Sequence, residues 1–148
     1  MIPDIITYLK TVTEVTDIVG SDPCKVFGGD VPDYVLTSKN AEVSIKPPYI
    51  LLETAGGPTI KHMGGDSGVR ERNFQVTCAD VRSSQDAELL YDAVRTALGF
   101  AAYEQWGNTF VQYSEMDEPT DVSAAPTDGG PVSLFLQAGR LTVRYNVG

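Results

Sequence analysis

Apolar residues recur at steps of three and four positions over residues 3–19, which is the spacing of one face of an α-helix. Pro3 suits the first turn of such a helix, and Gly20 suits its end. A second helix is predicted for residues 83–99, because serines provide its N-cap, an apolar stripe follows, and a glycine ends it. We therefore predict two main helices.

Several segments have strand character. Residues 49–54 form a continuous apolar run between a double proline and two glycines, which predicts a central strand covered on both faces. Residues 70–79 alternate between apolar and polar side chains, which predicts a half-buried strand paired with the previous one as a hairpin. Residues 109–116 form a further candidate, and residues 24–32 predict a brief strand that turns into a loop.

Residues 132–147 contain either one long strand or two strands joined by a bulge. Apolar residues occupy even positions from Val132 to Ala138 but odd positions from Leu141 to Val147. The apolar face would therefore change sides unless an extra residue intervenes. We predict a bulge or a tight turn at Gly139.

The pattern as a whole predicts one α+β domain over residues 1–148, with two main helices packed on a mainly antiparallel sheet of about four to five strands. Long loops are expected between the strands. One is the glycine-rich segment between the strands at 49–54 and 70–79. The other, 115–131, carries Glu115, Asp117, Glu118, Asp121 and Asp128 and contains no basic residue. Connections of this length are usually functional or disordered.

The composition limits the classes of partner. The chain has 20 acidic and 11 basic residues, a net charge of -9 at pH 7, which repels a nucleic acid backbone. No apolar run approaches the roughly 18 residues of a membrane span. The N-terminus also lacks a basic segment followed by an apolar one. We expect a soluble protein with no export signal, no membrane segment and no specific affinity for DNA.

One short motif has catalytic character. The tetrapeptide Gly65-Asp66-Ser67-Gly68 resembles the segment around the nucleophile of trypsin-like serine proteases, and the single histidine, His62, precedes it. A catalytic triad usually brings its members together from distant parts of the chain, whereas this loop offers no rigid element to hold an imidazole against the hydroxyl. We interpret the segment as a glycine-rich loop, with a serine hydrolase using Ser67 as an alternative.

The sequence contains no motif for a cofactor or a metal. The glycine-rich segment lacks the lysine and the serine or threonine of a phosphate-binding loop. The acidic run 115–121 lacks the spacing of a calcium loop. Cys24 and Cys78 lie far apart without ligand spacing, so we expect both to be reduced and Cys78 to lie in the core. We expect no catalytic residue, no cofactor and no metal.

An aromatic cluster follows the second predicted helix. It comprises Phe100, Tyr103, Trp106 and Phe110. Such a cluster either caps the core or forms a surface for a partner, and the pattern leaves both open.

The order of these pieces is typical of one family. A helix ending in DIVG is followed by KVFGGDVP, PPYILLE, RERNFQVTCAD, the helix SQDAELLYDAVRTALG and a closing GRLTVRYNVG. Over nearly the whole chain this order resembles the tail terminator (tail completion) proteins of long-tailed bacteriophages, prophages and gene-transfer particles. Segments 33–46 and 115–131 depart from the family pattern.

The resemblance implies a structural virion protein without enzymatic activity. Such a protein forms a ring, typically hexameric, that caps the finished tail tube, ends its polymerisation and presents a surface for joining the head. Its partners would be further copies of itself, the tail tube protein and a head-tail connector or head-closure protein. DNA would pass through the ring, which would be assembled in the host cytoplasm and lie at the head-proximal end of the tail. A head-closure or tail-joining adaptor of the neck is the alternative.

Two groups of charged residues are candidates for contacts with these partners. We expect residues 56–72 to form a flexible hairpin arm that orders on contact with the tube or a neighbouring copy. Its interaction residues would be Lys61, His62, Arg70 and Arg72, with the basic side chains meeting acidic partners. The acidic loop would contribute Glu115, Asp117, Glu118 and Asp121.

Overall fold

The computed structural model describes residues 1–21, 23–32, 34–56, 59–62, 65–123 and 134–146. The helices in these residues are α1 (Ile2–Leu9), α2 (Thr13–Val19) and α3 (Ser84–Leu98). The strands are β1 (Val26–Gly28), β2 (Tyr34–Leu36), β3 (Glu42–Ser44), β4 (Tyr49–Gly56), β5 (Thr59–His62), β6 (Gly65–Asp80), β7 (Ala102–Trp106), β8 (Thr109–Met116), β9 (Thr120–Asp121) and β10 (Phe135–Asn146).

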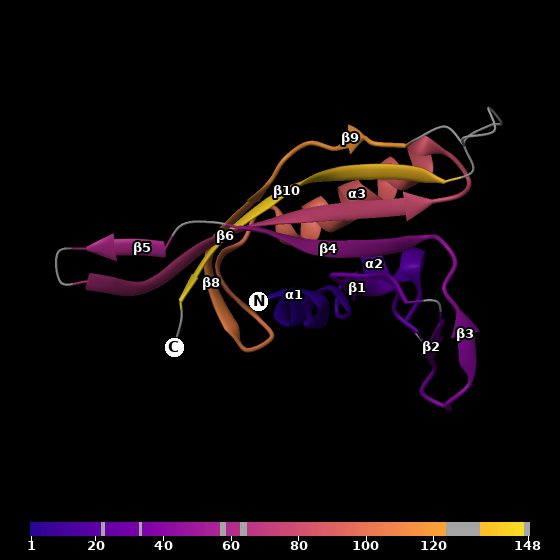
Figure 1. Cartoon of the computed structure of the whole chain (residues 1–148), viewed down its shortest axis with the longest axis horizontal. Coiled ribbons are helices and arrows are strands. Elements are labelled where there is room, and N and C mark those ends of the chain that lie inside the picture. Colours follow the sequence, from indigo (N-terminus) through magenta and orange to yellow (C-terminus); the bar gives the residue numbers. More distant parts are fainter. Residues whose placement is uncertain (22, 33, 57–58, 63–64, 124–133, 147–148) are drawn as a thin grey trace.

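Eight of the described strands form one curled sheet (Figure 1). Its order is β1-β4-β6-β10-β8-β7, with β5 added beside β6 and β9 beside β10. β1 and β4 are parallel, and all other neighbours in the sheet are antiparallel. β2 and β3 form a separate two-stranded sheet. The α+β class and the mainly antiparallel sheet are confirmed, but the sheet has more strands than predicted.

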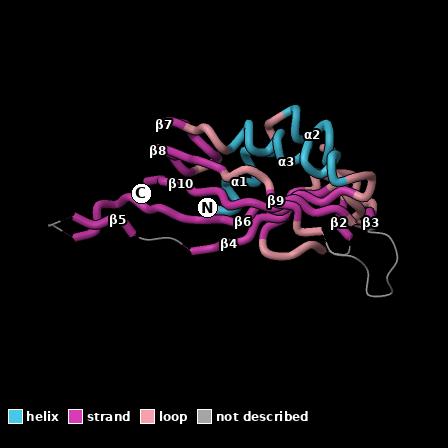
Figure 2. Tube along the Cα trace, turned by 90° about the horizontal axis from the view of Figure 1, so that it is seen from above, coloured by secondary structure: helices cyan, strands magenta, loops and turns pink. Residues whose placement is uncertain are grey.

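The three helices lie on one side of this sheet (Figure 2). α3 packs on β6, β8 and β10, whereas α1 packs against β1, β4 and β7, and α2 contacts α3. The core lies between the helices and the sheet. Its largest side chains, which include Trp106, Tyr91 and Phe74, are fully buried. No helix in the described ranges is long and apolar enough to cross a membrane.

The prediction of one continuous helix over residues 3–19 is wrong, because the helix breaks between Leu9 and Thr13. The amides of Thr11 and Val12 donate to carbonyls only three residues back, and Val12 has extended backbone angles. β-branched side chains at residues 11–13 have few rotamers in a helix, which favours a break there. Both pieces still bury the predicted apolar face.

The second helix and the main strands lie where the sequence places them. The side chain of Ser83 caps α3 by accepting a hydrogen bond from the amide of Asp86 at 3.1 Å. β4 lies between β1 and β6, as expected for a central strand. Ile50 and Leu52 are buried, but Leu51 on the other face is partly exposed, so β4 is not covered on both faces. Cys78 is buried in β6, as predicted.

The predicted bulge at Gly139 is absent. β10 pairs with β6 in unbroken register from Phe135 to Asn146, and its irregularity against β8 lies between Arg144 and Tyr145. Unbroken alternation places Leu136 and Ala138 on the sheet face opposite Leu141 and Val143. The apolar pattern changes sides because both faces of β10 are partly apolar, without an inserted residue.

Short polar contacts fix the ends of the helices to the sheet. The carboxylate of Asp4 in α1 accepts hydrogen bonds from the amide of Asn108 at 2.9 Å and the hydroxyl of Thr109 at 2.6 Å. At the end of α3, the buried hydroxyl of Ser114 accepts from the amide of Ala101 at 2.9 Å and donates to the carbonyl of Leu98. These contacts hold the β7–β8 hairpin against α1 and α3.

Candidate assembly surfaces

The glycine-rich segment forms a β-hairpin arm. β5 pairs with the first part of β6, with His62 opposite Gly65 and Lys61 opposite Asp66. The arm projects from one end of the sheet, away from the helices (Figure 1). The predicted hairpin is present. Most of the predicted loop is strand, because β5 pairs with the first residues of β6 inside the loop.

The structure brings two of the predicted basic residues together at the base of this arm. Arg70 and Arg72 lie on β6 opposite Tyr145 and Val143 of β10. Strand alternation puts both arginines on one face. Arg72 is exposed and has no ion pair among the described residues, whereas an Nη of Arg70 donates to the carbonyl of Val69 at 3.4 Å. The side chains of Lys61 and His62 lie outside the described part.

The hydrolase alternative also falls on the arm. Ser67 belongs to β6 and His62 to β5, so both occupy strands of the projecting hairpin. The side chains of both residues lie outside the described part of the chain. A serine nucleophile of the α/β-hydrolase class stands on a sharp turn between a strand and a helix, whereas Ser67 lies within strand β6. The serine hydrolase alternative therefore has to be tested chemically.

The first part of the predicted acidic loop contains strand residues, so the prediction of a loop is wrong there. Glu115 belongs to β8 and Asp121 to β9, while Asp117 and Glu118 lie in the short connection between these strands. Residues 124–131 of the predicted loop lie outside the described residues. The two predictions overlapped at residues 115–116, and the strand prediction for residues 109–116 is the one confirmed.

The connection after β8 is held by contacts from two directions. The amide of Asp117 donates to the carbonyl of Arg140 at 2.9 Å, and the hydroxyl of Tyr91 donates to the carbonyl of Asp117 at 2.6 Å. The Asp117 carboxylate also lies 3.7 Å from Nε of Arg140. Hydrogen bonds from Ser123 lower the pKa of Asp121. The acidic residues are thus exposed on an ordered edge of the sheet.

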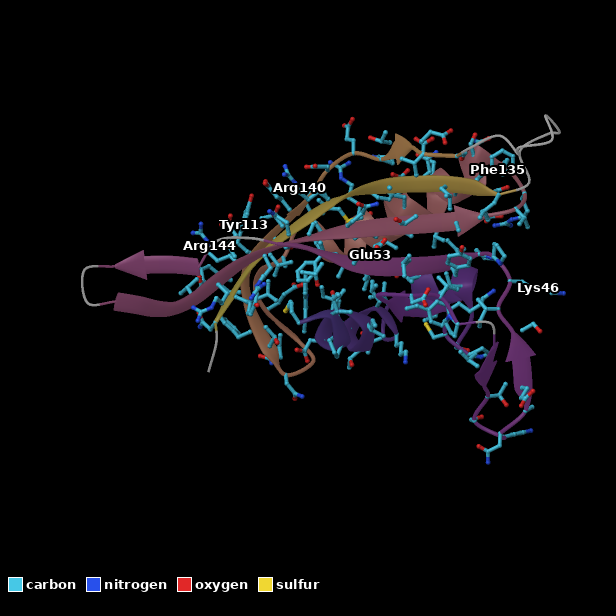
Figure 3. The ribbon with its side chains drawn as sticks, in the orientation of Figure 1. Lys46, Glu53, Tyr113, Phe135, Arg140 and Arg144 are labelled. Atoms are coloured by element: carbon cyan, nitrogen blue, oxygen red, sulfur yellow. The ribbon has the colours of Figure 1, made fainter. Side chains whose placement is uncertain are left out.

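A row of charged side chains that was not predicted lies on the sheet face opposite the helices. An Nη of Arg144 lies 2.9 Å from Oε2 of Glu71, and Arg144 stands beside Tyr113 of β8 (Figure 3). The hydroxyl of Tyr113 donates to Oε2 of Glu115 at 2.6 Å. The signal was present in the polar residues at even positions from 140 to 146, which imply a second, solvent-facing side of β10.

The predicted aromatic cluster divides between core and surface. Trp106 is buried, stacks on Tyr8 with ring centroids 5.4 Å apart, and donates from Nε1 to Glu104 at 2.7 Å. In contrast, Phe100 and Tyr103 are 71% and 75% exposed, and Phe110 is 39% exposed. Trp106 therefore belongs to the core, as the first interpretation expects, whereas a partner surface at the exposed aromatic residues stays a prediction.

Comparison with known proteins identifies the fold. No protein-family model matches the chain, and no curated protein sequence matches it. The structure is similar to a solved chain from the virion of a native gene transfer agent particle, with a TM-score of 0.66 and 12% sequence identity. The match covers 99% of this chain and 94% of that chain. The likeness in fold therefore extends over nearly the whole chain.

Proposed function

We propose that the chain is a structural virion protein of a tailed particle, without enzymatic activity. Its role would be to cap the tail tube as a ring, to end tube polymerisation and to form the surface that joins the head. The observation that carries this proposal is the likeness in fold, from end to end, to a chain of a gene transfer agent virion. The order of sequence elements supports the tail terminator role among the roles of such proteins.

The projecting arm gives this role a physical basis. A ring closes contacts between unlike surfaces that would otherwise continue into a filament. The arm of each copy would reach the tube or the neighbouring copy, where Lys61, Arg70 and Arg72 would meet acidic partners. The exposed acidic edge at Glu115, Asp117, Glu118 and Asp121 would serve a second contact.

The net charge suits a channel for DNA. A chain with a net charge of -9 at pH 7 repels the phosphates that pass through the ring, so DNA would cross it without specific binding. The further partners would be the tail tube protein and a head-tail connector or head-closure protein. The protein would be assembled in the host cytoplasm and remain in the virion at the head-proximal end of the tail.

Electron microscopy of particles produced without this protein tests the proposal. Overlong or irregular tails would support the terminator role. Tails of normal length that fail to join heads would support the alternative, a head-closure or tail-joining adaptor. Complete particles with normal tails would contradict both roles.

A further inference from the structure

The three helices leave a groove between them, which we call the helix groove. It has a volume of about 400 Å³. Residues of all three helices and of the break between α1 and α2 line it: Tyr8, Val12, Glu14, Asp92, Ala93, Thr96 and Ala97. The helices form the outermost layer on this side of the sheet, so the helix groove opens to solvent (Figure 2). A groove of this size accommodates several side chains of a partner segment.

The floor of the helix groove is apolar. Tyr8, Val12, Ala93 and Ala97 pack on the core, yet each is only partly buried. Leu89 lies one turn before Ala93 on the same side of α3 and is 55% exposed, so it extends the floor at one end. A contiguous exposed apolar surface with a polar rim is typical of a site that a partner covers.

The rims of the helix groove are acidic. Glu14 of α2 and Asp92 of α3 are both exposed and stand on different helices. A third carboxylate lies near the floor, since burial and then the charge of Glu104 raise the pKa of Tyr8. Carboxylates around a groove with apolar walls produce a negative potential that attracts cationic groups.

The basic residues of the surrounding helices do not neutralise this charge. None of the described residues that line the helix groove is a lysine or an arginine. Lys10, at the end of α1, lines a separate hollow beside Cys24. Arg95 lies on another side of α3, where its Nε donates to the carbonyl of Met116 at 3.0 Å and its guanidinium lies over the ring of Phe100. An occupant that carries positive charge would supply the missing partner.

The charge of the chain favours a different protein as this occupant. A second copy would bring the same net charge of -9 to the contact, which opposes its docking on an acidic groove. The arm of a second copy carries Lys61, Arg70 and Arg72, but it also carries Asp66 and Glu71. The apolar floor and acidic rims instead fit an amphipathic segment with lysine or arginine beside its apolar face.

We propose that the helix groove binds a segment of another protein, which presents apolar side chains to the floor and lysine or arginine to the two rims. The inference goes beyond the proposed function, because it depends on the groove alone and not on the position of the protein in a tail.

Photo-cross-linking in the cells that produce the protein tests this inference. Replacing Leu89 with the photoreactive amino acid benzoylphenylalanine keeps an apolar side chain at the end of the groove and leaves every lining residue in place. Irradiation should attach residue 89 to a peptide of another protein, which mass spectrometry identifies. That peptide should contain more lysine and arginine than aspartate and glutamate, with apolar residues between them.

Matched variants show whether the acidic rims hold the segment. Combining Glu14→Gln with Asp92→Asn should lower the yield of this product about fivefold, the effect of two exposed ion pairs. Glu88→Gln removes an exposed carboxylate of α3 that does not line the groove, so the yield should not change. The same photoreactive residue at Val122, which is 46% exposed after β9, should not give the product.

The outcomes separate the helix groove from the proposed function. No product at residue 89, an acidic peptide, or a peptide from a second copy of this chain would overturn the inference. A yield that falls equally with Glu88→Gln would also overturn it. A basic peptide at residue 89, together with normal tails on particles made without the protein, would support the groove and overturn the proposed function.

Discussion

The hydroxyl oxygen of Tyr91 lies directly against the backbone of Gly139: a Cβ at residue 139 would come within 1.9 Å of it. The same hydroxyl donates to the carbonyl of Asp117. Burial, together with the nearby Cys78 and Asp117, raises the pKa of Tyr91 to about 12 from the ordinary value of 10.0, so the hydroxyl remains a donor even in alkaline solution. One side chain of α3 therefore fixes both β10 and the connection after β8.

Gly139→Ala should destabilise the fold, although replacing a glycine within a strand normally strengthens it. The added methyl group must displace the buried ring of Tyr91, and overpacking of this kind costs about 1–3 kcal/mol. Urea unfolding followed by circular dichroism would measure the loss. An unchanged or increased free energy of unfolding would contradict the observed packing.

A double-mutant cycle with Tyr91→Phe provides the control for this contact. The phenylalanine variant alone loses the hydrogen bond to Asp117, a cost of about 1 kcal/mol. Because the methyl group of Gly139→Ala already displaces the hydroxyl, the two losses should sum to more than the loss in the double variant. Strict additivity would show that residues 91 and 139 do not interact.

Arg82→Gln should destabilise the fold in a pH-dependent way. Asp80 is fully buried, and Arg82 holds its carboxylate through Nη at 2.7 Å, Nε at 3.1 Å and its amide at 2.9 Å. Burial alone would raise the pKa of Asp80, but the hydrogen bonds and charge of Arg82 lower it. The side chain of Arg82 is 59% exposed, so solvent screens its charge and we expect only a small loss of stability near neutral pH.

The sign of this pH dependence follows from the lowered pKa. The stabilisation by Asp80 is present above its unfolded value of 3.8 and is lost as the pH falls through the lower folded value. The difference between wild type and Arg82→Gln should therefore shrink below about pH 4. Glu88→Gln, on the exposed face of α3, serves as the control. A difference that grows in acid would contradict this assignment.

Local patterns predicted most of the fold. The cap at Ser83, the alternation in β6 and the limits of β8 depend on residues close in sequence, and all three are confirmed. The prediction of a bulge at Gly139 was wrong because the reason for a glycine at this position is not local. That glycine is required by Tyr91, 48 positions earlier, and no periodicity along β10 reveals the contact.

The candidate surfaces were predicted less completely for the same reason. The arm was identified from its glycines, but the charged row on the outer face depends on strands brought together from distant segments, such as Arg144 beside Glu71. The exposure of Tyr103 and the burial of Trp106 depend on where α1 packs, since Tyr8 covers the tryptophan. Composition alone could not separate these two aromatic residues.

Deletion of residues 60–67 should leave the fold intact but prevent tail capping. The buried core residues that the structure describes lie outside this segment, so the thermal midpoint should change little. Tails assembled with the deleted protein should be overlong. Lys39→Glu, a charge change in an exposed turn far from the arm, should preserve normal tails. Normal tail lengths with the deletion would contradict a capping role for the arm.

A fluorophosphonate probe should not label the wild-type protein. Such probes react with a serine whose hydroxyl is activated by a neighbouring base. Active trypsin in the same reaction would show that the probe is competent. Labelling of the wild type that disappears in Ser67→Ala would overturn the structural interpretation of the arm and establish a hydrolase.

The central claim is that this protein forms the head-proximal end of a tail, and cryo-electron microscopy of purified particles tests it most directly. The account predicts a closed ring of this fold between the last ring of tube subunits and the head connector. Particles that lack the polypeptide, or that carry it elsewhere, would contradict the account.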